Sequence, residues 1–231
     1  MESKTYFNKV GSGPNLVLLH GWEQNKEGWG QIIDILSKDF TCWTLDLPYF
    51  GQNDTTLKDK TPLGYAEWVN AFLLANKITK AYLLGHSFGG RVAIICAGDN
   101  KSVEKIIVYG TPAYRSNKGT ISSVIRKLGI KNIPVISDKL RSSDYKNADG
   151  VKKEIFTKTV DFDLSPFIKR VRKRTLLIWG EKDKEAKIDV ARRLKATITN
   201  SELYIIPNAD HFAHLEKPLL FSAVVKKFLN E

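Results

Sequence analysis

Seven short apolar runs of strand length recur along the chain, with helical patterns between several of them. Runs such as Leu16-Val17-Leu18-Leu19 are continuous rather than alternating. A strand reads this way when helices cover both faces of its sheet. The alternation therefore predicts an α/β fold with a mostly parallel central sheet and helices on both faces. The predicted strands are Thr5–Lys9, Asn15–His20, Thr41–Asp46, Ala81–Gly85, Glu104–Tyr109, Thr175–Gly180 and Glu202–Pro207.

Three of the intervening or following segments have apolar residues at helical spacing. Each places its apolar residues on one face, as expected for a helix that packs on a sheet. The positions are Trp68, Phe72 and Ala75 within Leu63–Lys77, then Val190, Leu194 and Ile198, and finally Phe221, Val224, Val225 and Phe228.

The segment 113–174 breaks the alternation, because it contains no clear strand. Apolar residues from Ile121 to Leu128 follow the pattern of one amphipathic helix, and Val151, Ile155 and Thr159 suggest a second. Ser165 before Pro166 resembles an N-cap that opens a short third helix reaching Val171. We therefore expect a core formed by residues 1–112 and 175–231, with 113–174 as a small helical insertion.

The net charge of +11 is concentrated in that insertion. The chain has 36 Lys and Arg against 25 Asp and Glu. Residues 1–112 hold 11 basic and 11 acidic side chains, residues 113–174 hold 16 and 6, and residues 175–231 hold 9 and 8. The insertion thus carries 16 − 6 = +10, which marks either a solvated surface or a binding surface.

Composition excludes several classes of protein. With 42% hydrophobic residues the chain is not expected to be disordered. No apolar stretch approaches the roughly 20 residues of a membrane helix, and the N-terminus has no secretory signal pattern. The distant Cys42 and Cys96 fit no metal pattern, and we expect buried free thiols in a cytoplasmic protein, with one disulfide as the alternative.

The strongest chemical signal is the sequence Gly85-His86-Ser87-Phe88-Gly89, followed by Gly90. It follows a predicted strand and precedes the apolar stretch 92–95. A serine on a sharp strand-to-helix turn has an exposed hydroxyl, and the glycines permit the turn. This context predicts that Ser87 is a nucleophile rather than part of an ordinary glycine-rich turn.

A serine nucleophile needs a base and an orienting acid. His211 lies in a loop after the last strand and can reach the serine turn, with His214 as its rival. Asp183 follows the sixth strand and gives the chain order Ser…Asp…His, which matches one known triad arrangement. The other histidines are His20 and His86, and the alternative acids are Glu181, Asp189 and Asp210.

A tetrahedral intermediate also needs hydrogen-bond donors for its oxyanion. One predicted donor is the backbone N–H of Phe88, which follows the nucleophile. The second is the backbone N–H of Trp22, in the loop after the strand that ends at His20. Gly21 would let that backbone approach the site closely.

Together these residues resemble the α/β-hydrolase superfamily, of the serine carboxylesterase type. A weaker likeness is to the carboxylesterases that cleave pimeloyl-carrier-protein methyl ester. The resemblance implies that 113–174 is a lid over the active site. The matching stretches are Leu18-Leu19-His20-Gly21-Trp22 with Trp29, Asp46-Leu47-Pro48-Tyr49-Phe50-Gly51, Gly85–Gly90, Gly180–Asp183 and His211–Pro218.

The chain departs from the family pattern at three positions. Tyr49 and Asn53 stand where the family often has a second Gly and a Ser, and Asp210 stands where a glycine commonly precedes the catalytic histidine. A carboxylate at Asp210 could raise the pKa of His211 if it faced the ring. Related dehalogenases and epoxide hydrolases have Asp in place of Ser87, so we do not expect their chemistry.

We therefore predict a cofactor-free, metal-free serine hydrolase that cleaves carboxylic esters through an acyl-enzyme. Trp22, Phe88 and Tyr114 are expected to line the substrate pocket. The same triad could serve a thioesterase, lactonase, C–C hydrolase or acyltransferase, and a non-catalytic ligand receptor is a further alternative. The expected partners are a small-molecule ester and, at the basic lid, an acidic carrier protein or another anionic surface. Nucleic acid is not expected.

Overall fold

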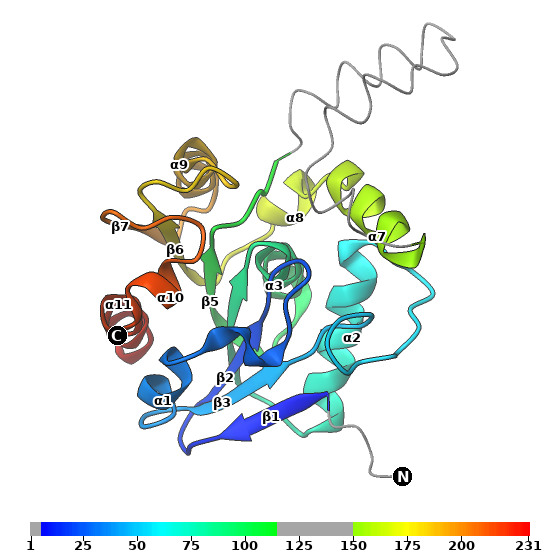
Figure 1. Ribbon diagram of the computed structural model, residues 1–231, viewed down its shortest axis with the longest axis horizontal. Helices are drawn as coiled ribbons and strands as arrows, with labels where there is room; N and C mark the ends of the chain where they lie inside the picture. The colour runs from blue at the N-terminus through cyan, green and yellow to red at the C-terminus, as the bar shows by residue number, and fades with distance from the viewer. Residues whose placement is uncertain (1–5, 115–149) are drawn as a thin grey trace, which may run out of the picture.

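A computed structural model of the chain describes residues 6–114 and 150–231 (Figure 1). In those residues seven strands form one sheet, in the order β1-β3-β2-β4-β5-β6-β7. The edge strand β1 pairs antiparallel with β3, and all other neighbouring strands pair in parallel. The strands are β1 (Phe7–Val10), β2 (Asn15–Leu19), β3 (Thr41–Leu45), β4 (Ala81–His86), β5 (Val103–Tyr109), β6 (Arg174–Gly180) and β7 (Ser201–Ile206).

This sheet confirms the predicted α/β architecture, and each strand lies within two residues of its predicted bounds. Because the strands are parallel, the carboxyl ends of β2, β4, β5, β6 and β7 meet along one edge of the sheet. Ligands of open α/β sheets bind outside that edge. The loops that follow these strands therefore set the position of a site.

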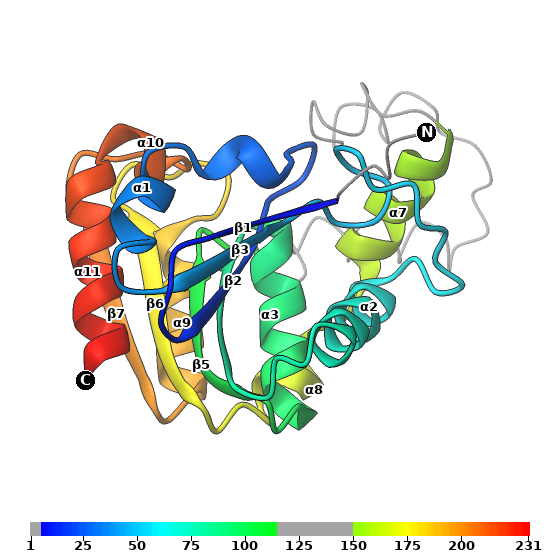
Figure 2. The ribbon, with the colours of Figure 1, turned by 90° about the horizontal axis from the view of Figure 1, so that it is seen from below.

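Helices cover both faces of the sheet, as Figure 2 shows with the strands between two groups of helices. In β2, Leu16 and Leu18 pack toward α1 and α11, whereas Val17 and Leu19 pack toward α2 and α3. All four side chains are fully buried, which explains the continuous apolar run. The helices are η1 (Lys26–Trp29), α1 (Ile32–Leu36), α2 (Pro62–Ala75), α3 (Phe88–Asp99), α7 (Gly150–Asp161), α8 (Ser165–Ile168), α9 (Ile188–Thr197), α10 (Ala213–Glu216) and α11 (Pro218–Asn230).

The predicted helices that fall within the described residues are present, but two of them differ in detail. In α2 the predicted apolar position Ala75 is exposed, and the buried face is centred on Tyr65, Val69 and Phe72. In α8, Ser165 is the first helical residue rather than the cap, and the helix ends at Ile168. Tertiary packing decides which face of α2 is buried, and the spacing of apolar residues alone does not encode it.

Two predicted helices of the insertion fall within the described residues, and one does not. Helix α7 confirms the helix expected around Ile155 and Thr159, which are buried, although Val151 is exposed. The helix expected from Ile121 to Leu128 lies outside the described residues. The boundaries 113–174 of the insertion stay a prediction.

Arg91 of α3 binds the end of α7. Its Nη2 atom donates to the carbonyl oxygens of Thr159 (2.8 Å) and Phe162 (3.0 Å), and its Nη1 atom donates to that of Pro112. Arg91 is buried and forms no ion pair within the part of the chain that the structure describes. Burial lowers the pKa of its guanidinium to about 10. A buried cation that three carbonyls hold thus joins α7 to α3.

We predict that Arg91→Gln lowers the free energy of unfolding by about 2–4 kcal/mol, because three carbonyl oxygens lose their donor in a buried place. The matched control is Arg170→Gln, which removes an exposed guanidinium paired with Asp99 at 3.5 Å. That change should cost about 0.5 kcal/mol or less. Urea unfolding of the three proteins measures the difference, and equal losses would contradict the anchoring role of Arg91.

Candidate active site

The turn between β4 and α3 holds Ser87 in a left-handed backbone conformation, with φ 50° and ψ −107°. A residue other than glycine is strained there by roughly 1–3 kcal/mol, and such strain clusters at functional sites. The N–H of Ser87 donates to the carbonyl of Tyr109 (2.8 Å), and the N–H of Gly89 donates to that of His20 (3.1 Å). The predicted strand-to-helix turn is confirmed.

Two glycines make this turn possible. A Cβ atom on Gly89 would lie 2.0 Å from the carbonyl oxygen of Leu19, and one on Gly85 would lie 2.4 Å from that of Gly89. No side chain fits at either distance. The start of α3 therefore packs backbone to backbone against the end of β2.

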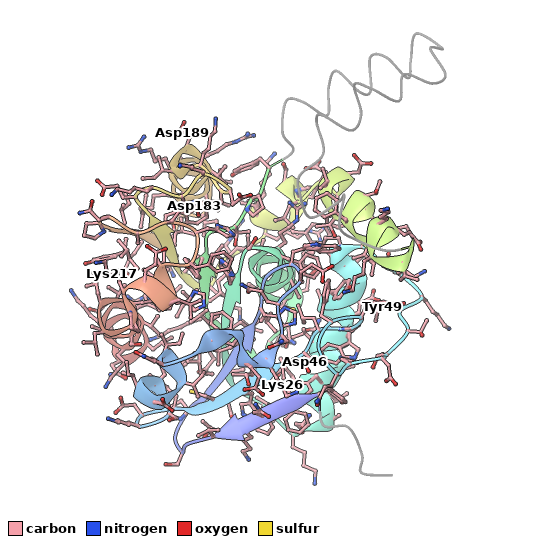
Figure 3. All side chains as sticks on the ribbon, viewed as in Figure 1. Lys26, Asp46, Tyr49, Asp183, Asp189 and Lys217 are labelled. Atoms are coloured by element: carbon pink, nitrogen blue, oxygen red, sulfur yellow. The ribbon has the colours of Figure 1, made fainter. Side chains whose placement is uncertain are left out.

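Asp183 and His211 form a hydrogen bond at the ends of β6 and β7, and Figure 3 labels Asp183 in this region. His211 Nδ1 lies 2.8 Å from Asp183 Oδ2. Asp183 Oδ1 accepts from the N–H groups of Glu185 (2.9 Å) and Ala186 (2.8 Å), and its side chain is fully buried. A carboxylate can only accept, so Nδ1 of His211 is the donor of this hydrogen bond, and in a neutral imidazole this arrangement leaves the lone pair on Nε2.

The end of β5 brings these groups beside the serine turn. Tyr109 accepts the N–H of Ser87, and Gly110 follows it. A Cβ atom on Gly110 would lie 3.2 Å from His211 Cε1 and 3.3 Å from Asp183 Oδ2. The segments that carry Ser87, Asp183 and His211 therefore converge on one short stretch of backbone.

The alternative acids after β6 have other partners. Glu181 Oε2 accepts from the N–H of Asn208 (2.8 Å). Asp189 is exposed and pairs with Arg192 (3.2 Å). Neither carboxylate forms a recorded contact with His211, whereas Asp183 does.

The alternative histidine and the unusual Asp210 are also engaged elsewhere. Asp210 Oδ1 accepts from the backbone N–H of His211 (2.9 Å), so this carboxylate holds the main chain rather than the imidazole. His214 Nδ1 lies 3.2 Å from the hydroxyl of Tyr109, and its Nε2 lies 3.0 Å from the carbonyl of Gly28. Both ring nitrogens of His214 are thus used in packing α10 against the core.

The two predicted oxyanion donors flank this turn. The ring of Trp22 packs edge-on against Phe88, with ring centroids 6.1 Å apart, and against Phe50 and Phe156, at 5.1 Å each. In residues 6–114 and 150–231, no hydrogen bond is recorded from the backbone N–H of Trp22 or of Phe88. Their oxyanion role stays a prediction.

Tyr114 lies against α9 instead of beside Trp22 and Phe88. The guanidinium of Arg193 lies 3.7 Å from the centre of its ring, and its hydroxyl lies 3.4 Å from Thr197 Oγ1. The predicted contact of Tyr114 with substrate is untested by these contacts.

Two of the three positions that depart from the usual pattern lie in the loop after β3, which holds a buried ion pair. Lys26 Nζ lies 3.0 Å from Asp46 Oδ2, and both side chains are at most 9% exposed (Figure 3). Asn53 donates from Nδ2 to the carbonyl of Asp46 (2.7 Å). Tyr49 has φ 68°, a conformation that glycine adopts without strain. The side-chain amide of Asn53 thus stabilises the loop after β3. Tyr49 keeps the positive-φ backbone conformation that glycine would adopt, at a cost in backbone strain.

Sequence reasoning missed two contacts that hold the loop of His211. Tyr109 donates its hydroxyl to the carbonyl of His211 (2.5 Å), and His86 Nε2 lies 3.1 Å from the same oxygen. Tyr109 ends an apolar strand and so resembles a core residue in the sequence. The only signal for His86 was its place beside the serine.

The described part of the chain has neither a metal-binding cluster nor a membrane-spanning helix. No group of three or more His, Cys, Asp or Glu residues there could hold a metal ion. No helix there is long and apolar enough to cross a bilayer. Cys42 and Cys96 are both free and buried, as predicted.

Comparison with known proteins places the chain in a family. The family model of the alpha/beta hydrolase fold matches residues 14–124 and 128–218. The chain therefore belongs to the alpha/beta hydrolase fold family, and it is a hydrolase.

Two relatives and one solved structure illustrate what the chain is similar to. The pimeloyl-[acyl-carrier protein] methyl ester esterase of Wigglesworthia glossinidia brevipalpis is 26% identical over 98% of both chains. The 2-hydroxy-6-oxononadienedioate/2-hydroxy-6-oxononatrienedioate hydrolase of Escherichia coli is 26% identical, over 98% of this chain and 91% of its own. The solved structure of an esterase from Exiguobacterium antarcticum matches in fold, with a TM-score of 0.79 at 20% identity over 98% of this chain and 95% of its own.

The buried histidines predict how stability depends on pH. Desolvation lowers the pKa of His20 and of His214 to about 4, and that of His86 well below 6.5. The unfolded chain binds more protons than the folded one between about pH 6.5 and pH 4. The contribution of these neutral histidines to the free energy of unfolding should therefore have its full value above pH 6.5. It should fall as pH decreases through this window, by up to about 1.4 kcal/mol per pH unit for each histidine.

Urea unfolding at pH 7.5, 6.5, 5.5 and 4.5 measures this slope. The variant His214→Gln should show a shallower fall, because one buried imidazole no longer has to gain a proton. A wild-type free energy of unfolding that is constant down to pH 4.5 would contradict the prediction.

Proposed function

We propose that this hydrolase cleaves carboxylic esters with Ser87 as nucleophile, His211 as general base and acid, and Asp183 as the orienting group. The observation that carries the proposal is the strained Ser87 turn beside a buried Asp183–His211 hydrogen bond. A nucleophile next to a base, with the base oriented by a third group, is the geometry of an activated serine.

In the proposed reaction, Ser87 Oγ attacks the ester carbonyl carbon while His211 Nε2 takes the hydroxyl proton. The backbone N–H groups of Trp22 and Phe88 bind the resulting oxyanion, and Asp183 stabilises the imidazolium. The tetrahedral intermediate collapses to an acyl-enzyme, and His211 gives its proton to the leaving alcohol. Water then attacks the acyl carbon, His211 takes a proton from it, and Ser87 regains that proton as the acid leaves.

The surroundings of Trp22 favour an apolar acyl group. Its indole ring contacts Phe50, Phe88 and Phe156, so the acyl lining that these residues provide is aromatic. Ligand pockets are lined mainly by such side chains, with a few polar groups that fix orientation. Tyr114, which follows β5 by five residues and contacts α9, stays a further proposed member of the lining.

The name of one relative favours an alternative reaction. The relative from Escherichia coli is named as a hydrolase of 2-hydroxy-6-oxononadienedioate. Cleavage of a carbon–carbon bond next to a ketone by the same three residues is therefore the second candidate function.

We predict that a fluorophosphonate probe labels the wild-type protein at Ser87 and that the folded variant Ser87→Ala is not labelled. Turnover of p-nitrophenyl esters with acyl chains of two to twelve carbons should fall by about 10⁴-fold or more in Ser87→Ala. The same proteins are also assayed with a 2-hydroxy-6-oxo-dienoate. A higher kcat/KM for this substrate than for every ester would favour carbon–carbon bond cleavage, the second candidate function. The absence of wild-type labelling, with the fold intact, would contradict both.

The basic segment 113–174 is proposed to be a lid that meets an acidic partner. Its described helix α7 contacts the predicted oxyanion loop, because Lys152 pairs with Glu23 (2.9 Å) and Phe156 packs on Trp22. An acidic acyl carrier protein or another anionic surface would be attracted by residues 113–168, which hold 11 basic and 6 acidic side chains, whereas the basic cluster 169–174 lies at the amino end of β6, away from the site. We also propose a cytoplasmic location, where buried free thiols persist.

If the lid attracts such a partner, kcat/KM for an acyl ester on an acyl carrier protein should fall about tenfold or more between 50 and 500 mM NaCl, since salt screens charge. A neutral short ester provides the control and should change less than twofold. Equal salt dependence of the two substrates would contradict the steering role of the lid.

A further inference from the structure

The imidazole of His86 lies between two loops of the proposed site, although it takes no part in the reaction above. The ring is 1% exposed and stacks on Tyr109, with ring centroids 4.5 Å apart and planes at 28°. It lies next to Ser87 in the chain, but its recorded hydrogen-bond partners are in the loops of His211 and Gln24. A buried polar ring of this kind requires an explanation for both nitrogens.

One nitrogen contacts the loop of the proposed base. His86 Nε2 lies 3.1 Å from the carbonyl oxygen of His211, and the two rings are 4.6 Å apart. The hydroxyl of Tyr109 donates to the same oxygen. Two groups of the core therefore hold the main chain of His211, while Asp183 holds its ring.

The other nitrogen contacts the predicted oxyanion loop. His86 Nδ1 lies 3.2 Å from Gln24 Oε1, which accepts the N–H of Gly21 (2.9 Å). A Cβ atom on Gly21 would lie 2.9 Å from His86 Nδ1, so this packing is close. Gly21 immediately precedes Trp22, whose N–H is the proposed oxyanion donor.

We propose that His86 is a positioning residue that sets the base loop of His211 and the oxyanion loop of Trp22 relative to the nucleophile turn. The inference rests on the proposed function of Ser87, His211 and Asp183. Burial lowers the pKa of His86 well below 6.5, so the ring is neutral at pH 7. A neutral ring has a single N–H and donates to only one of the two facing oxygen atoms, so its other nitrogen contacts its loop by packing, and the effect of the ring is one of geometry rather than of charge.

The test compares His86→Phe, Gln24→Met and the double variant with wild type. Phenylalanine keeps a flat ring for the stack on Tyr109 and removes both nitrogens. Misplaced catalytic groups impair the transition state more than substrate binding, so kcat should fall about 10–100-fold in His86→Phe, with KM within threefold. The same loss should appear in the rate of fluorophosphonate labelling of Ser87.

The double variant tests the route through Gln24. If His86 acts on the oxyanion loop through Gln24, the two losses should not multiply, and the double variant should be close to the slower single variant. Rescue is measured with His86→Gln, which restores a donor and should recover part of kcat.

The control for stability is Asn100→Ala, at the far end of α3 from Ser87. It removes the hydrogen bond to Asn70 (2.6 Å) and that to the N–H of Ser102 (2.8 Å). It should lower Tm without changing kcat by more than twofold. A structural role for His86 alone would likewise lower Tm and leave kcat per folded molecule unchanged.

The outcomes separate this inference from the proposed function. The role of His86 would be overturned if folded His86→Phe kept wild-type kinetics within threefold, or if the losses in the double variant were fully multiplicative. The proposed function would stand in both cases. If the wild-type protein hydrolyses no ester, the rates of fluorophosphonate labelling of Ser87 in the same variants are compared in place of kcat. If wild type is also not labelled, the proposed function fails and the role of His86 fails with it.

Discussion

The start of α3 touches the end of β2, and the rest of the site depends on this backbone contact. At Gly89 even a single Cβ atom would lie 2.0 Å from the carbonyl oxygen of Leu19. The close approach forces the chain through the strained conformation of Ser87 and brings the loop after β2 beside the same turn. One steric constraint thus places the proposed nucleophile and both proposed oxyanion donors together.

The second half of the site is held by polar contacts rather than by close packing. His211 is bound through its ring by Asp183 and through its carbonyl by Tyr109 and His86. Asp210 holds its N–H. Multiple buried hydrogen bonds at one residue leave it little freedom, and a base must be placed within a fraction of an ångström to be effective.

The inner strands β2 to β6 were predictable because they are buried on both faces, which leaves mostly continuous apolar runs in the sequence, whereas the edge strands β1 and β7 are partly exposed. The serine turn was predictable because close packing at Gly85 and Gly89 demands glycine. The buried face of α2 was not, since Ala75 is apolar yet exposed and tertiary packing chose Tyr65 and Val69 instead. Contacts such as that of His86 with His211 span 125 residues, and no local pattern records them. The catalytic roles stay predictions.

The central claim is that His211, and not its neighbour His214, activates Ser87. The rate of fluorophosphonate labelling in His211→Ala and in His214→Ala tests it most directly, with folding checked by circular dichroism. The hydrogen bond of His211 to Asp183 predicts a loss of about 10³-fold or more in His211→Ala and of less than tenfold in His214→Ala. Equal losses in the two variants, or a larger loss in His214→Ala, would contradict the account.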